Sequence, residues 1–75
     1  PAHTLVSFDL VNPISSDIRI DVYDAFGKLV KTIRENADGK AFIQFSSEDM
    51  AAGMYYVSIL IDGQVIQRKL AVSQN

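Results

Sequence analysis

Cysteine and tryptophan do not occur in this chain of 75 residues, and histidine occurs once. Without cysteine there is no disulfide and no cysteine-ligated zinc or iron–sulfur site, and a single imidazole is too few for most transition-metal sites. The formal net charge of −2, from nine acidic and seven basic residues, lacks the basic surplus of nucleic-acid-binding domains. The sequence therefore predicts no metal, no cofactor and no nucleic-acid partner.

Long hydrophobic runs are also missing. The longest mainly apolar stretch, Met50 to Ile61, is broken by Gly53 and Ser58, and it falls well short of the roughly twenty residues of a membrane-spanning helix. The first residues carry neither the basic nor the apolar segment of a signal peptide. Because the chain opens on Pro1 rather than methionine, we expect it to be a piece of a longer protein. The missing cysteine fits either a reducing cytosol or export by a lineage that uses few disulfides.

What the sequence does contain is an alternation of apolar and polar residues with a period of two, the pattern of half-buried β-strands. At 48% hydrophobic and 21% charged residues, the composition is that of one folded domain. Turn residues separate the alternating segments, which lie near residues 6–10, 18–23, 28–34, 41–45, 54–61 and 64–72. The pattern predicts a small antiparallel immunoglobulin-like β-sandwich of six to seven strands, forming a single domain over residues 1–75.

Glycine, asparagine and aspartate mark the turns. Asp24–Gly27 predicts a short turn in which Gly27 takes a positive φ. Asp62-Gly63 predicts a hairpin with a two-residue type I′ turn, the strongest hairpin signal in the chain. The clusters Asn12–Asp17 and Asn36–Gly39 predict loops between the other strands.

Two segments depart from strict alternation. The third strand segment has consecutive apolar residues, which predicts a bulge or a position at the edge of a sheet. Residues 46–53 predict one helical or 3₁₀ turn, capped by Ser46 or Ser47 and closed by Gly53 in a left-handed conformation. Met50 would then close one end of the core.

Few side chains suit catalysis. His3 lies in a terminal segment, where we expect an ordinary surface histidine rather than a catalytic base. Carboxylates occur close together at Asp21 and Asp24 and again at Glu48 and Asp49. Paired carboxylates can perform acid–base catalysis, but so small a domain has little room for a substrate cleft between them. We interpret them as solvated loop acids and predict no enzyme.

Two groups of side chains could either bind a ligand or serve only the fold. A weak calcium site that includes Asp9 or Asp17 is the first, although the acids are too sparse for a dedicated calcium loop. The second is a platform of Tyr23, Tyr55 and Tyr56 that stacks a sugar or a base. The structural interpretation of these tyrosines places Tyr55 in the core, with the other two partly covering it.

The pair Arg68-Lys69 is the one local basic cluster. On a terminal strand such a pair can act as a gatekeeper that discourages pairing between sheet edges. It can also form a recognition surface. Spacing alone favours the gatekeeper.

Three segments of the sequence follow one another in a characteristic order. In Ile20–Val30 a strand end leads through a short turn to a glycine and a basic residue. In Met50–Val57 an apolar residue is followed, after a short spacer, by glycine, an apolar residue and tyrosine. The third segment, Arg68–Val72, has two basic residues followed by apolar ones. Together they resemble the type A C-terminal sorting domain of cargo proteins of the type IX (Por) secretion system of Bacteroidetes, over nearly the whole chain. The motif positions are Tyr23, Asp24, Gly27, Gly53 and Tyr55.

The resemblance implies a non-catalytic address label at the C-terminus of a larger exported protein. Its partners would be the outer-membrane secretion machinery, a sortase-like peptidase and the cargo domains that precede it in the chain. The cargo would pass through the periplasm to the cell surface or the extracellular medium. The residues that the machinery would recognise are Arg68, Lys69, Leu70, Ala71 and Val72.

One feature departs from the family pattern. The family usually opens with an Asn-Pro motif ahead of its first strand, whereas Asn12-Pro13 lies between the first two predicted strands. We therefore expect the sequence to start inside the domain. The alternative function is that of an immunoglobulin- or fibronectin-like spacer, or of a module that binds protein or carbohydrate. Flagellar hook-capping domains share the strand–turn–glycine block, but they commonly carry a Trp-Asp-Gly segment that this chain lacks.

Overall fold

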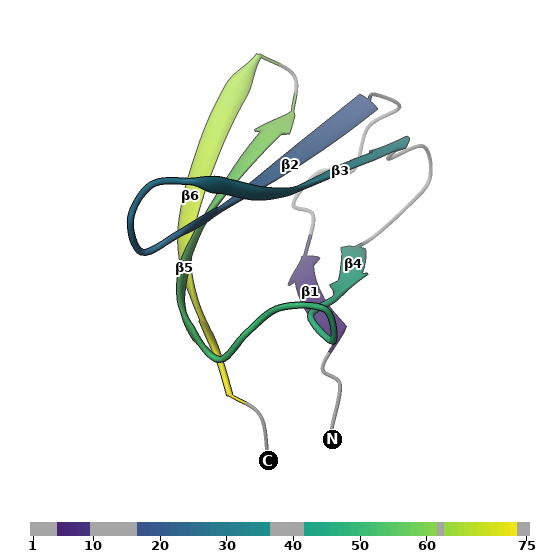
Figure 1. Ribbon diagram of the computed structural model, residues 1–75. Helices are drawn as coiled ribbons and strands as arrows, with labels where there is room; N and C mark the ends of the chain where they lie inside the picture. The colour runs from purple at the N-terminus through teal and green to yellow at the C-terminus, as the bar shows by residue number, and fades with distance from the viewer. Residues whose placement is uncertain (1–4, 10–16, 37–41, 62, 74–75) are drawn as a thin grey trace.

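The computed structural model describes residues 5–9, 17–36, 42–61 and 63–73. These residues form strands joined by turns (Figure 1). The strands are β1 (Leu5–Asp9), β2 (Asp17–Asp24), β3 (Leu29–Asn36), β4 (Phe42–Ser46), β5 (Gly53–Ile61) and β6 (Gln64–Val72). Their number and order confirm the prediction of an all-β domain.

The strands form two antiparallel sheets. The larger sheet has the order β3-β2-β5-β6, and the smaller one pairs β1 with β4. In Figure 1 the smaller sheet lies beside one face of the larger one. This arrangement is consistent with the predicted immunoglobulin-like sandwich.

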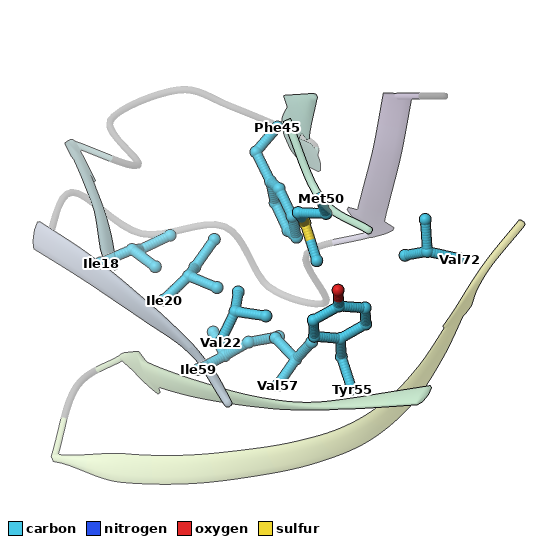
Figure 2. Close-up of a cluster of buried hydrophobic side chains, with 9 residues drawn as sticks. All are labelled: Ile18, Ile20, Val22, Phe45, Met50, Tyr55, Val57, Ile59 and Val72. Atoms are coloured by element: carbon cyan, nitrogen blue, oxygen red, sulfur yellow. The ribbon is translucent and has the colours of Figure 1, made fainter. Parts of the chain in front are cut away.

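The core lies between the two sheets, against the inner face of the larger one (Figure 2). Alternate residues of β2 and β5 point inward, and Ile20 is directly opposite Ile59 in the ladder. Both are almost fully buried. From the other side, Phe45 of β4 and Met50 close the core. Branched side chains on two central strands thus supply one apolar face. The buried apolar residues are Ile18, Ile20, Val22, Phe45, Met50, Tyr55, Val57, Ile59 and Val72.

Strand β3 has both features that its broken alternation predicted. It lies at the edge of the larger sheet. Its register with β2 also shifts between Val22 and Tyr23, whose partners are Lys31 and Leu29. Val30 is therefore the extra residue of a bulge. The strand extends to Asn36, two residues beyond the predicted end.

The predicted single turn within residues 46–53 is confirmed. It lies at Glu48 and Asp49 and is closed by a hydrogen bond of 3.0 Å from Met50 N to the Ser47 carbonyl, three residues back, as in one turn of a 3₁₀ helix. The Ser46 hydroxyl accepts a 3.2 Å hydrogen bond from Glu48 N, as predicted for a cap. Met50 closes the core as predicted.

Gly53 does not close that turn in a left-handed conformation. It is the first residue of β5 and is opposite Val72, with a φ of +154°. Pairing with β6 requires a more extended backbone than the left-handed cap has, which explains the difference. Side chains other than glycine rarely adopt this φ, so the position still favours glycine.

The predicted turns at Gly27 and Gly63 are confirmed, with φ values of 85° and 73°. The hairpin joins Ile61 to Gln64 as the pair that flanks its turn. Asp62 lies outside the described residues, as do the predicted loops at 12–16 and 37–39 and the strand positions Leu10 and Ala41.

Candidate functional site

The first motif segment builds the turn between β2 and β3. Asp24 Oδ1 accepts hydrogen bonds from Phe26 N at 2.9 Å and from Lys28 N at 3.0 Å. Gly27 N donates to the Asp24 carbonyl at 3.0 Å, and Asp24 N donates to the Lys28 carbonyl at 2.9 Å. A carboxylate that accepts backbone hydrogens two and four residues ahead fixes an Asx turn. Phe26 is 96% exposed, so it contributes its backbone N–H to the turn and not its side chain.

The second motif segment ties the 47–52 connection to the larger sheet. Tyr55 is buried on the inner face, and its hydroxyl donates a 2.6 Å hydrogen bond to the Ala51 carbonyl. A tyrosine that bonds a backbone group a few residues upstream is the device of the tyrosine corner in immunoglobulin-like sandwiches. Gly53 lies between the two and supplies the backbone conformation with which β5 begins. The Gly-x-Tyr spacing is therefore structural.

The third motif segment is the end of β6, an edge strand of the larger sheet. Leu70 packs against the core and Val72 is part of it, as their spacing predicted. Arg68 and Lys69 are both exposed and point to opposite faces. Arg68 lies opposite the buried Val57 and thus on the inner face, at the open side of the sandwich.

On the outer face the three segments meet in one row. Tyr23 of β2 is opposite Tyr56 of β5, which is opposite Lys69 of β6. These three side chains, together with Gln67 and Arg68, line a shallow groove of about 410 Å³. On the outer face the groove offers aromatic surface, the Gln67 amide and the Lys69 cation, while the Arg68 side chain points to the inner face.

The tyrosine prediction is confirmed for Tyr55 and wrong for its neighbours. Tyr55 is buried in the core. Tyr23 and Tyr56 lie on the outer face, and Tyr56 is 45% exposed. They do not cover Tyr55, because successive residues of a strand point to opposite sides.

The interpretation of the paired acids as solvated loop acids is wrong for Asp21, which is buried within strand β2. Asp21 is only 7% exposed, and its carboxylate accepts hydrogen bonds from Arg19 Nε at 3.1 Å and Thr32 Oγ1 at 3.0 Å. Asp24 is the other member of this candidate acid–base pair. Its carboxylate accepts the backbone hydrogen bonds of the turn between β2 and β3. Asp17 accepts a 3.2 Å hydrogen bond from the Asn36 side chain.

Asp49 forms an ion pair with Lys31 of β3 at 2.8 Å. The hydrogen bond from the Lys31 ammonium holds the pKa of Asp49 below its ordinary value of 3.8. The same ammonium donates a 2.9 Å hydrogen bond to the Ser46 carbonyl. Lys31 therefore fastens β3 to the connection that follows β4.

Within the described part of the chain, no cluster of three or more acidic or histidine side chains is placed to hold a metal ion. His3 and the side chain of Asp9 lie outside that part. A second groove, of about 520 Å³, lies toward the Asp17 end of the larger sheet and contains none of the motif residues.

Sequence reasoning missed Tyr56 and Gln67 as neighbours of the basic pair. The hairpin signal already contained the information. Once Ile61 and Gln64 flank the turn, counting outward along both strands places Tyr56 opposite Lys69. Tyr23 could not be added in this way, since the register between β2 and β5 depends on no local turn.

The fold and the exposed row together define a small immunoglobulin-like β-domain whose motif residues shape turns and one edge of a sheet. The chain belongs to the family of secretion system C-terminal sorting domains, whose family model matches residues 1–73. Searches of curated proteins and of solved structures found no match.

Membership in this family makes the chain a sorting signal for type IX secretion, a system of Bacteroidetes. It implies an interaction with the secretion machinery and export to the cell surface or the extracellular space. Among the described residues, none belongs to a helix long and apolar enough to cross a membrane.

Proposed function

We propose that residues 1–75 form a single non-catalytic domain that serves as the address label of a larger exported protein. The outer-membrane machinery reads the label after the cargo has reached the periplasm. The label is removed by a sortase-like peptidase as the cargo is anchored to the surface or released. Cargo domains precede it in the same chain.

The residues that we propose to be read are Arg68, Lys69, Leu70, Ala71 and Val72. One observation supports this proposal above the others. The motif segments, far apart in sequence, converge on the outer-face row of Tyr23, Tyr56 and Lys69. Turn formation explains Asp24 and Gly27, but it does not explain exposed cations at the end of β6.

The charges in this region also favour recognition. No described residue forms an ion pair with Lys69, and Arg68 Nη1 donates to the Gln67 carbonyl, 2.8 Å away, rather than to a carboxylate. On a chain of net charge −2, these two cations make both faces of the end of β6 locally positive. Complementary charge on a partner speeds encounter and fixes orientation.

The test is export of a periplasmic reporter fused ahead of residues 1–75 in a host with type IX secretion. We expect the fusion to be exported and deletion of residues 68–75 to abolish export. Because the deletion also removes Leu70 and Val72 from the core, the sharper variant is Arg68→Gln/Lys69→Gln. We expect this variant to fold and to remain in the cell.

The matched control is Arg34→Gln/Lys40→Gln, which removes the same charge from positions outside the three motif segments. We expect this fusion to be exported like the parent. Equal export of both double variants would refute recognition of the basic pair. Export of the truncated fusion would refute the terminal strand as the signal.

A further inference from the structure

Strand β6 presents an open backbone edge. It pairs with β5 along its whole length, Gln64 to Val72, without a register shift. Among the described residues no strand lies on its other side. A long, regular edge without a bulge is a template for a further strand.

The hairpin shows which backbone groups face that edge. In a two-residue hairpin the residues that flank the turn exchange both of their backbone hydrogen bonds, and such pairs then alternate along the ladder. Ile61 and Gln64 flank the turn. The backbone groups of four β6 residues therefore point away from β5, and these residues are Val65, Gln67, Lys69 and Ala71.

Two observed hydrogen bonds agree with this alternation. Arg68 Nη1 reaches the Gln67 carbonyl at 2.8 Å, as a side chain can when that carbonyl faces the open edge. The same alternation continues from β6 through β5 to β2, and it predicts that the backbone groups of Asp24 point toward β3. Asp24 N indeed donates a 2.9 Å hydrogen bond to the Lys28 carbonyl.

We infer that the secretion machinery supplies an extended segment that adds to β6 as a fifth strand of the larger sheet. This inference rests on the proposed function and names the form of the partner. Strand addition obtains its affinity from main-chain hydrogen bonds and its specificity from alternate side chains. The guanidinium of Arg68 releases the Gln67 carbonyl when the new strand binds.

The side chains of β6 define the chemistry of that segment. On the inner face Arg68 lies between Ile66 and Leu70, both of which pack against the core. An added strand would place its own inner-face residues beside these three. The fitting pattern is apolar, acidic, apolar at every second position. Lys69 on the outer face favours a second acid.

A second copy of this chain fits the edge poorly. If two β6 strands paired antiparallel with full overlap, Gln64 would face Val72 and each Arg68 would face the other. The two arginines would occupy a non-hydrogen-bonded pair, in which side chains are closest. Like charges in that position are destabilising. Arg68 therefore blocks self-pairing and selects an acidic partner.

The first test uses the ¹⁵N-labelled 75-residue chain and the probe peptide Thr-Val-Thr-Glu-Thr-Val-Thr, which reads the same in both directions. We expect the amide signals of Val65, Gln67, Lys69 and Ala71 to shift most. A peptide with lysine in place of glutamate should bind about tenfold more weakly. Equal binding of the two peptides, larger shifts on β3, or comparable binding of a peptide that copies Gln64–Val72 would each overturn the inference.

The second test is export of the reporter fusion with proline on either edge of the sheet. Gln67→Pro removes an amide hydrogen that faces the open side of β6 and leaves the bonds to β5 intact. By the same alternation Arg34→Pro removes an outward amide hydrogen from β3. We expect loss of export and of peptide binding only with Gln67→Pro, and near-native melting of both variants.

Export of Gln67→Pro like the parent would overturn strand addition. The proposed function would then still be supported by retention of Arg68→Gln/Lys69→Gln. Normal export of that double variant as well would refute both.

Discussion

The β3 edge and the β6 edge of the larger sheet both lack a neighbouring strand among the described residues, but the two edges are protected in different ways. Its bulge at Val30 interrupts the ladder. Its Lys31 points inward and is bonded to the Ser46 carbonyl and to Asp49. Bulges and inward charges are the devices that natural sheets use to prevent edge pairing.

Strand β6 has no bulge, and its inward charge, Arg68, is bonded to the Gln67 carbonyl of its own strand rather than to another segment. Its register is continuous over Gln64–Val72, and its protection is the charged pair Arg68-Lys69. Charge repels a second copy of the same strand but attracts an acidic one. The comparison indicates that the gatekeeper and the recognition interpretations of this pair are compatible. We therefore expect the β3 edge to exclude an added strand and the β6 edge to accept an acidic one.

The largest loss of stability is expected from changes in the central strands β2 and β5, with which the edge strands β3 and β6 pair. Ile20 and Ile59 face each other in the core and are 1% and 4% exposed. Ile20→Ala or Ile59→Ala should cost about 2–5 kcal/mol, which is most of the roughly 3–5 kcal/mol that a core of this size supplies. Thermal melts followed by circular dichroism should show largely unfolded variants. A cooperative melt that hardly moves would mean that the core face has been misassigned.

The next largest effect is the difference in stability between proline substitutions at two neighbouring positions of β6. Arg68→Pro removes a hydrogen bond to β5 and should cost about 1–3 kcal/mol. Gln67→Pro removes an outward amide hydrogen and should cost about 1 kcal/mol or less. Urea denaturation of the two variants measures the difference. Equal losses would show that the assigned alternation of the edge is incorrect.

A smaller effect is expected from the bonds that fasten β3. Lys31→Met leaves the Ser46 carbonyl without its ammonium donor and should cost about 1–2 kcal/mol. Lys69→Met, on the other edge, should change the free energy of unfolding by no more than about 0.5 kcal/mol. If Lys69→Met were the more destabilising, β6 would be the edge anchored by its lysine.

The smallest effect concerns pH. Because the pKa of Asp49 is lowered in the folded state, its ion pair with Lys31 stabilises the domain above pH 3.8. The contribution is lost as the pH falls through the lowered pKa. Asp49 is exposed, so we expect only a slight flattening of the acid limb in Asp49→Asn. Denaturant midpoints measured between about pH 6 and 3 should show it. Parallel curves for parent and variant would show that the pair does not contribute.

Much of the fold could be predicted from the sequence, because period-two alternation and turn residues act locally. The Asp62-Gly63 signal alone fixes the β5–β6 register, and the consecutive apolar residues of β3 predict its bulge. The failures involve non-local partners. The sequence predicts a left-handed cap at Gly53, because nothing near it in the chain shows that it pairs with Val72.

The proposed recognition surface could likewise be predicted only in part from the sequence. The basic pair and the motif tyrosines are visible in the sequence, but the row that they form requires the register between β2 and β5. The inward position of Arg68 follows from that of Val57, 11 residues earlier in the chain. Only the structure shows that the Arg68 guanidinium donates a hydrogen bond to the Gln67 carbonyl.

The central claim is that the machinery contacts the β6 edge and not the β3 edge. Its most direct test places a photo-crosslinking amino acid at position 69 or at position 34 of the reporter fusion in the type IX host. We predict an adduct with an outer-membrane component of the secretion machinery from position 69 and none from position 34. Adducts of equal yield from both positions, or an adduct from position 34 alone, would contradict the account.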